Sequence, residues 1–203
     1  MNQNNVCSFR PISSDLENGL RENILLQNTS PILFAEILKK IQIEKLKKRR
    51  PIMHFGDQPS EIYFVISGSL KRSMQGVGRR EHIFDVTYAN EFDSPYVEWV
   101  AGSMPYYSIS AATNAIVGKM SLFEWKKIIQ TDEGLNNLFS DLVQKKYLEM
   151  VNHSSNLLLL NSVENYKRVS KTMPKLVKTL NKRELGAYLG ISAETMSKIL
   201  RYA

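Results

Sequence analysis

The spacing of apolar residues changes along the chain and separates segments of different structure. Before residue 52, apolar residues at helical spacing predict a short helix around Asp15–Leu26 and a second helix over Pro31–Ile43. The basic run Lys45–Arg50, which ends at Pro51, favours a solvated loop. These predictions describe a helical start to the chain.

From Ile52 the apolar pattern is that of short strands. Ile62–Ile66 predicts a buried strand, and Ser67–Ser69 is a turn signal. Further short strands are expected at Leu70–Met74, His82–Val86, Tyr106–Ala111 and Ala115–Met120. Ser121 can cap a helix that runs to Ile129. Short strands separated by closely spaced turns indicate a β-barrel or jelly roll.

A long amphipathic helix follows this strand-rich segment. Its apolar stripe consists of Leu135, Leu138, Phe139, Leu142, Val143, Tyr147, Met150 and Val151. Such a helix between two domains commonly pairs with a second copy of itself, so we expect Leu135, Leu138, Leu142, Val143 and Tyr147 to form a homodimer contact. The alternative is that the stripe packs on its own barrel.

The segment Lys182–Arg201 predicts two short helices joined by a tight turn. Asn181 and Glu184 can form a capping box on the first helix, and Gly190 can end that helix in the left-handed conformation. Ser192 can cap the second helix. The small residue Gly186 falls where the helices cross, and the apolar residues are spaced to meet in one core: Leu185, Leu189, Ile191, Met196 and Ile199.

This arrangement leaves one face of the second helix exposed. The face carries Ala193, Glu194, Ser197, Lys198 and Arg201. It is typical of a DNA-binding helix-turn-helix, whose second helix enters the major groove. An ordinary helical hairpin also has caps and a core. Here the small residue at the helix crossing, the glycine of the turn and the apolar residues all fall at the expected spacing, and this favours the DNA-binding interpretation.

The positive charge of the chain is concentrated in the same region. The net charge is +7, from 27 Lys and Arg and 20 Asp and Glu. Residues 145–203 hold 11 of the basic and four of the acidic residues, so residues 1–144 are neutral. A basic module on a neutral body suits a protein that contacts DNA phosphates.

Composition excludes several other classes of protein. The longest obvious apolar run, Leu157–Leu160, is too short to span a membrane, and the N-terminus lacks a signal-peptide pattern. The single cysteine, Cys7, excludes an internal disulfide and a cluster held by four cysteines of one chain, and it fits the cytoplasm. We expect no enzyme, because no phosphate-binding glycine loop, metal-ligand spacing or nucleophile–base pattern is present.

The order of these elements resembles the Crp/Fnr superfamily of bacterial transcription regulators. The motifs that carry the resemblance are Phe55–Leu70, with its glycine, strand and turn, and Leu189–Leu200, which is similar to the recognition helix. The resemblance implies an α+β fold with a jelly-roll sensor domain over 1–130, a dimerisation helix over 131–161 and a helix-turn-helix domain over 162–203. It also implies homodimers, double-stranded DNA and RNA polymerase as partners.

The family positions that touch DNA can be transferred residue by residue. Bases would be contacted by Glu194, Ser197 and Lys198. Besides these family positions, our candidates for contacts to the DNA backbone are Lys182, Arg183, Ser192, Thr195 and Arg201. The resemblance extends to the end of the chain, but the β-hairpin wing that follows the recognition helix in many relatives is missing. We expect this C-terminus, which lacks the wing, to be the natural one.

The sensor departs from the cyclic-nucleotide members of the family. Their Gly-Glu and Arg-Ser/Thr pairs fall here at Ser94-Pro95 and Pro105-Tyr106, and Glu91–Ala115 contains no Arg or Lys. Burial of a phosphate without a neighbouring cation is energetically unfavourable, so cyclic AMP is disfavoured as a ligand. Haem is also disfavoured, because the three histidines (His54, His82 and His153) are more often structural.

An uncharged small-molecule effector is the alternative to a sensor without a ligand. The walls of the effector pocket would be formed by Phe92, Tyr96, Trp99, Tyr106 and Tyr107. Met150 and Val151 of the long helix would close this pocket. These aromatic residues can equally fill the barrel. A protein that binds ligands or other proteins but no longer binds DNA is the remaining functional alternative.

Overall fold

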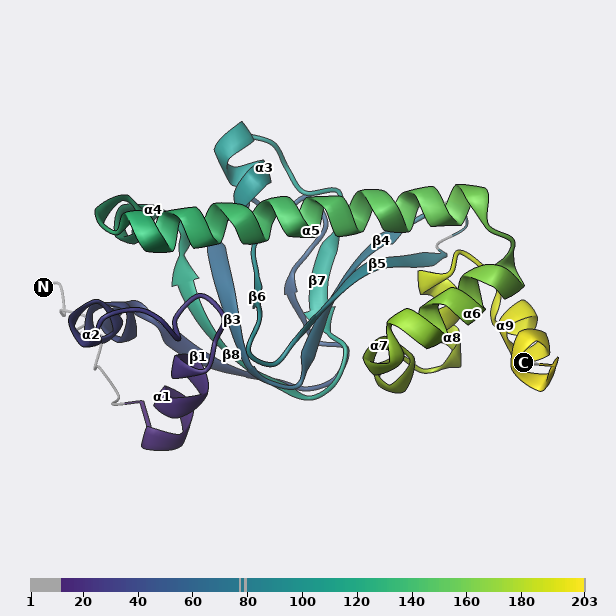
Figure 1. Ribbon diagram of the computed structural model, residues 1–203, viewed down its shortest axis with the longest axis horizontal. Helices are drawn as coiled ribbons and strands as arrows, with labels where there is room; N and C mark the ends of the chain where they lie inside the picture. Colours follow the sequence, from purple (N-terminus) through teal and green to yellow (C-terminus); the bar gives the residue numbers. More distant parts are fainter. Residues whose placement is uncertain (1–11, 77, 79, 203) are drawn as a thin grey trace, which may run out of the picture.

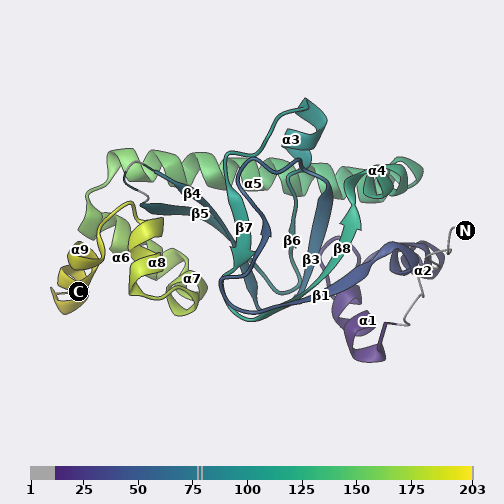
Figure 2. The same cartoon turned by 180° about the vertical axis from the view of Figure 1, so that it is seen from behind.

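Two antiparallel four-stranded sheets form the centre of the molecule in the computed structural model, which describes residues 12–76, 78 and 80–202. The first sheet has the order β1 (Gln42–Leu46), β8 (Ala115–Ser121), β3 (Glu61–Ser67), β6 (Phe92–Asp93). The second has the order β2 (Pro51–Met53), β7 (Ser108–Ala111), β4 (Ser69–Gln75), β5 (Glu81–Tyr88). Figures 1 and 2 show these strands as a jelly-roll body.

The strand β3 is buried on both of its faces, which explains its continuous apolar sequence. Tyr63 and Val65 belong to a core cluster with residues of the second sheet, such as Leu70 and Ile109. Phe64, on the opposite face of β3, packs with helical residues such as Trp125. Because side chains alternate across a strand, this single strand joins two layers of the core.

Helices cover the outer face of the first sheet. They are α1 (Ser14–Arg21), α2 (Pro31–Lys40) and α4 (Leu122–Thr131), while α3 (Tyr96–Ala101) projects beside the long helix. Ser121 caps α4 as expected, since its Oγ accepts a hydrogen bond from the amide of Phe123 at 3.2 Å. The predicted α+β jelly roll followed by helices is confirmed.

The long helix α5 (Glu133–Leu159) runs along the body, and its C-terminal end lies above a bundle of four short helices (Figure 1). These helices are α6 (Ser162–Thr172), α7 (Pro174–Thr179), α8 (Lys182–Tyr188) and α9 (Ala193–Tyr202). Their apolar core includes Ile83 and Val86 of β5. The C-terminal helices are therefore packed against the barrel as well as against one another.

Two predictions for the N-terminal part are wrong. The helix expected over Pro31–Ile43 ends at Lys40, and the loop expected at Lys45–Arg50 begins inside β1. Strand β1 pairs with β8, with Lys45 opposite Ile116. Pairing with a strand some 70 residues away overrides a helical pattern that continued through Ile41 and Ile43.

The helix expected over Asp15–Leu26 is also shorter, since α1 ends at Arg21. Cys7 lies outside the described residues. Among the helices of the described chain, none combines the length and apolar character needed to cross a membrane.

Candidate nucleic-acid interface

The helix-turn-helix has the caps that the sequence predicted. The Oδ1 atom of Asn181 accepts from the amide of Glu184 at 3.0 Å, and Oε2 of Glu184 accepts from the amide of Asn181 at 3.1 Å. At the start of α9, Oγ of Ser192 accepts from the amide of Thr195 at 3.1 Å. Each cap satisfies backbone donors that a helix start otherwise leaves unpaired.

Two glycines allow the tight packing of α8 against α9. Gly190 has a φ of +70°, which strains any residue with a Cβ atom. A Cβ atom on Gly186 would lie 3.1 Å from the backbone oxygen of Ile191 and 3.6 Å from Cβ of Met196. The five predicted core residues, Leu185, Leu189, Ile191, Met196 and Ile199, all belong to the apolar cluster of this domain.

The predicted base-contacting residues lie on an accessible side of α9. Glu194 and Lys198 are exposed and Ser197 is half-buried. Among the predicted backbone-contacting residues, Lys182, Arg183 and Arg201 are exposed, whereas Ser192 and Thr195 are half-buried. A row of polar groups one helical turn apart on a short helix has the size and spacing to enter a major groove.

Glu184 also joins this domain to the barrel. Its carboxylate lies 3.2 Å from Nζ of Lys71 in β4 and 3.7 Å from Nζ of Lys48. Burial alone would raise the pKa of Glu184, but the Asn181 amide and the Lys71 ammonium hold it below its usual value. Lys71 pairs with Glu81 as well, at 2.9 Å, so one buried cation links both strands of the β4–β5 hairpin to α8.

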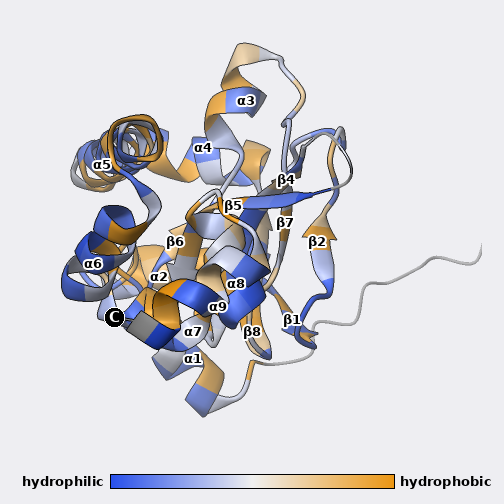
Figure 3. Ribbon diagram, turned by 90° about the vertical axis from the view of Figure 1, so that its right-hand side faces the viewer, coloured by the Kyte–Doolittle hydropathy of each residue, from blue (hydrophilic) through white to orange (hydrophobic). Residues whose placement is uncertain are grey.

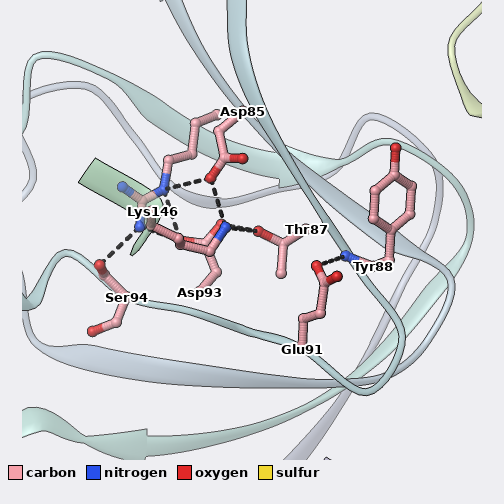
Figure 4. A network of polar contacts seen from close by, with 8 residues as sticks. Asp85, Thr87, Tyr88, Glu91, Asp93, Ser94 and Lys146 are labelled. Carbon is pink, nitrogen blue, oxygen red and sulfur yellow. Dashed lines mark hydrogen bonds and ion pairs between the residues drawn. The ribbon is translucent and has the colours of Figure 1, made fainter. Parts of the chain in front are cut away.

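Inside the barrel, Arg72 and Lys146 form an ion network with Asp85 and Asp93 (Figure 4). Nε of Arg72 donates to Asp93 at 2.8 Å, and its guanidinium also donates to the Ser94 carbonyl at 2.8 Å. Lys146 of α5 lies 2.9 Å from Asp85. We call Arg72, Asp85, Asp93 and Lys146 the barrel ion network.

The barrel ion network holds the buried groups Arg72 and Asp93 and the half-buried Lys146 in their charged forms. Burial would raise the pKa of Asp93, but Arg72 and Lys146 outweigh it and lower that pKa below its usual range. Burial likewise opposes the charge of Lys146, and Asp85 and Asp93 raise its pKa. Two cations face two carboxylates, so the network is neutral as a whole and ties β4, β5, β6 and α5 together.

The sequence did not point to these positions. Lys71 and Arg72 are adjacent cations within a predicted strand, and both are almost fully buried. Adjacent residues of a strand face opposite sides, so two neighbouring cations in one strand are a signal that could have indicated an acidic partner on each face. Glu91–Ala115 contains no Arg or Lys, but Arg72 of β4 donates to the Ser94 carbonyl, and Lys146 of α5 lies near the Asp93 carboxylate.

The aromatic effector pocket expected from the sequence is not assembled. Phe92, Tyr96 and Trp99 pack in the cluster that includes Phe139 of α5, whereas Tyr107 is buried between the sheets against Phe84. Tyr106 is 76% exposed and contacts Phe55 on the surface. Of the expected residues, Phe92 and Met150 line a common cleft, which lies outside the barrel. Most of these aromatics serve as core, the alternative left open by the sequence.

The expected dimer stripe on α5 mostly faces the barrel. Leu135 is buried, and Leu138, Leu142 and Val143 pack against the same cluster as Phe139. Tyr147 and Val151 are the exposed members of the stripe, at 65% and 41%. The first four residues of the expected contact therefore pack within one protomer, because the sheet and α4 offer an apolar surface to that side of the helix, and their part in a dimer contact stays a prediction.

His153 of α5 contacts the helix-turn-helix directly. Its ring stacks on Tyr188 of α8, with ring centroids 4.1 Å apart. Burial lowers the pKa of His153 to about 4, and the nearby Arg168 adds to this effect. The charged groups around the ring are Asp85 of β5, Arg168 of α6, and Lys146 and Glu149 of α5 itself.

We expect His153 to make the folded protein less stable in mild acid. The unfolded chain binds a proton at this group below about pH 6.5 and the folded chain only below about pH 4. Stability is therefore lost as the pH falls through this window, by roughly 2 kcal/mol at pH 5 and about 3 kcal/mol once the pH is below 4. The free energy of unfolding should be measured with urea at pH 7.5 and at pH 5. Between these pH values it should fall by about 2 kcal/mol less in His153→Phe than in the wild type.

His54→Phe provides the control for this measurement. The His54 side chain is 69% exposed and lies outside the His153–Tyr188 contact, so this variant makes the same substitution away from the buried ring. An unchanged pH dependence in His153→Phe would show that the imidazole is not kept neutral by burial.

A jelly roll, a long connecting helix and a C-terminal helix-turn-helix with an exposed second helix define the architecture of Crp/Fnr-type transcription regulators. No protein-family model matches the chain. In sequence it is similar to the cAMP-activated global transcriptional regulator CRP of Haemophilus influenzae, with 19% identity over 177 residues, 81% of this chain and 78% of that protein.

Solved structures of this class have the same fold. The c-di-GMP responsive global regulator CLP of Xanthomonas campestris is similar with a TM-score of 0.70 and 17% identity, over 85% of this chain and 91% of that one. A structure from Eubacterium rectale assigned to the Crp/Fnr family of transcriptional regulators has a TM-score of 0.70 and 14% identity, over 90% and 87%. The chain thus has the Crp/Fnr fold, and the resemblance expected from its sequence is confirmed.

Proposed function

We propose that this protein is a homodimeric, sequence-specific DNA-binding transcription regulator whose sensor domain has lost the cyclic-nucleotide site. The observation that carries the proposal is the exposed polar face of α9, held by the capped turn after α8. A regulator of this kind acts in the cytoplasm, contacts RNA polymerase at promoters and needs no catalytic site. In this proposal the sensor domain ends at residue 130 and the dimerisation helix ends at residue 161, after which the helix-turn-helix domain begins.

The chemistry of this face suits base recognition. A carboxylate such as Glu194 can accept from the cytosine amino group, and the ammonium of Lys198 can donate to guanine acceptors. Lys182, Arg183, Ser192, Thr195 and Arg201 would hold the domain on the phosphates. Concentration of the excess positive charge in residues 145–203 supports this orientation of the molecule toward DNA.

We expect Lys198→Ala to weaken binding to the preferred site by about 1–3 kcal/mol and to relax the choice of base there. The preferred site would first be selected from random duplexes, and affinity would then be measured by fluorescence anisotropy at several salt concentrations. Lys178→Ala is the matched control, because it removes the same charge from an exposed position on α7. Equal weakening on all sequences would make Lys198 a phosphate contact instead.

The proposed dimer uses the outer side of α5. Leu148, Val151 and Leu158 are 60%, 41% and 87% exposed, and Tyr147 lies beside them. Their separations of three and seven residues match one seam of a two-stranded coiled coil. Figure 3, which views α5 end-on, shows the rest of the molecule on one side of this helix. A two-fold dimer would place two recognition helices about 34 Å apart on a near-palindromic operator.

The sensor interior does not fit a cyclic nucleotide. Its phosphate would require a free cation, whereas Arg72 and Lys146 are both paired with carboxylates in the barrel ion network. Ser94-Pro95 and Pro105-Tyr106 supply neither of the family's charged residues. Haem and a four-cysteine cluster also have no place in the proposal, since the sequence has one cysteine and His153 is stacked on Tyr188.

We therefore expect cyclic AMP and cyclic GMP, at roughly millimolar concentration, to leave the melting temperature unchanged, because a ligand that does not bind the folded state adds no stability. Differential scanning fluorimetry with and without each nucleotide measures this. An upward shift accompanied by tighter operator binding would show that the nucleotide site is intact.

The alternative function is a protein-interaction or ligand-binding module that no longer binds DNA. Salt-dependent binding to duplex DNA separates the two, because phosphate contacts release counterions. A wild-type protein whose duplex affinity is absent at low salt would support the alternative.

A further inference from the structure

A cleft of about 430 Å³ lies where the barrel, the long helix and the DNA-binding domain meet. Its walls come from β5, α5 and α6–α8, and they include Phe84, Tyr88, Met150, His153, Arg168 and Tyr188. This volume is within the range of small-molecule sites, roughly 300–1,000 Å³. The cleft is separate from the helix face proposed to contact DNA, and it shares Asp85 and Lys146 with the barrel ion network.

Buried polar atoms in this cleft lack partners. His153 is 5% exposed, and neither of its ring nitrogens has a hydrogen bond of normal geometry to any described residue, although the Ile83 backbone lies near. Tyr88 lines the cleft as well, and its buried hydroxyl, which lies toward Thr179 of α7, has no hydrogen bond of normal geometry within the described chain. A buried donor or acceptor without a partner destabilises the folded state, so its retention calls for an explanation.

The charges of the cleft cancel one another. Three acidic residues (Asp85, Glu91, Glu149) and three basic residues (Lys145, Lys146, Arg168) line it. Asp85 is bonded to Lys146, and Glu91 accepts from the backbone amide of Tyr88 at 2.9 Å. Neither a strongly anionic nor a strongly cationic ligand would find a surplus of opposite charge there.

We propose that this cleft binds a small uncharged organic molecule that is mostly apolar and exchanges hydrogen bonds with His153 and Tyr88. A neutral imidazole offers one donor and one acceptor, and a tyrosine hydroxyl offers both. Aromatic and aliphatic walls from Phe84, Met150 and Tyr188 would bury the remainder of the ligand.

The site has a regulatory consequence that rests on the proposed function. The ligand would touch the barrel, the long helix and the DNA-binding domain at once, so it binds best to one arrangement of these three parts. Its binding and the binding of operator DNA would then be coupled, each changing the affinity of the other by the same factor.

Binding of probe compounds to the full-length protein tests the site. The probes are indole and quinolin-4-one, which are neutral, and their charged relatives indole-3-acetate and tryptamine, titrated at pH 7.5 by ligand-observed NMR. We expect saturable binding of the neutral probes and affinities at least about tenfold weaker for the charged ones.

Three variants locate the binding. His153→Phe keeps a ring against Tyr188 but removes both nitrogens, and should weaken probe binding by roughly 2–10-fold. Met150→Trp should fill the cleft and abolish binding. Asn137→Trp adds the same side chain at an exposed position of α5 outside the cleft, and should bind as the wild type does. Far-ultraviolet circular dichroism confirms that each variant is folded.

Failure of both neutral probes to bind, equal binding of the charged probes, or unchanged binding by folded Met150→Trp would overturn the inference. Duplex binding by the wild type is measured in parallel without any probe. A protein that binds DNA but no probe contradicts the ligand site alone, whereas one that binds probe but no DNA contradicts the proposed function alone.

Discussion

Asp93→Ala is expected to lower the free energy of unfolding by about 3–5 kcal/mol. Asp93 is fully buried and is the main partner of the Arg72 guanidinium, whose side chain is 9% exposed. Removal of the carboxylate leaves a buried cation that the Asp85 carboxylate, 4.0 Å from Nε of Arg72 and already bonded to Lys146, compensates poorly. Urea unfolding followed by circular dichroism measures the loss.

Two further variants test the cause of this destabilisation. Asp141→Ala removes an exposed carboxylate from α5 and should change stability by less than about 0.5 kcal/mol. The double variant Arg72→Met/Asp93→Leu removes both charges and should recover much of the stability, because well-packed apolar residues often replace a buried ion pair without loss. A loss below about 1 kcal/mol in Asp93→Ala would show that Arg72 is not a desolvated charge.

The second large effect is expected at the dimer contact. Leu148→Glu/Val151→Glu places like charges opposite one another in the proposed seam and should yield monomers in sedimentation velocity experiments. Each monomer would contact one half-site, so operator affinity should fall by roughly 10²–10⁴-fold as the advantage of linked binding is lost. The barrel should stay folded, because both residues are exposed in one protomer.

The controls separate this seam from the barrel-facing side of α5. Asn137→Glu adds a charge at an exposed position before the seam and should leave the dimer intact. Leu142→Ala, on the side that packs against the barrel, should cost stability without changing the oligomeric state. A Leu148→Glu/Val151→Glu protein that still sediments as a dimer would refute the proposed contact.

The sequence by itself determined the helix-turn-helix. Its caps join residues three positions apart, such as Asn181 with Glu184 and Ser192 with Thr195, and Gly190 ends α8 through its own backbone. Local signals of this kind do not depend on the rest of the fold. For the same reason the exposed face of α9, with Glu194 and Lys198, could be predicted before the structure was known.

The long helix was determined only in part. Its period predicted a helix, but one protomer's barrel occupies the side that carries Leu138 and Leu142 and leaves Leu148 and Val151 free for a partner. Periodicity shows that a helix has apolar sides without showing what each side meets. The competing surfaces of the barrel and of a second protomer exist only once the chain has folded.

The sensor and the junction between domains were decided by tertiary structure alone. Arg72 meets Asp93 across 21 positions, Lys146 meets Asp85 across 61, and Lys71 meets Glu184 across 113. His153 likewise meets Tyr188 from another helix. The stabilisation of a buried charge comes from the partner that folding brings within about 3 Å, and no pattern of neighbouring residues encodes that partner.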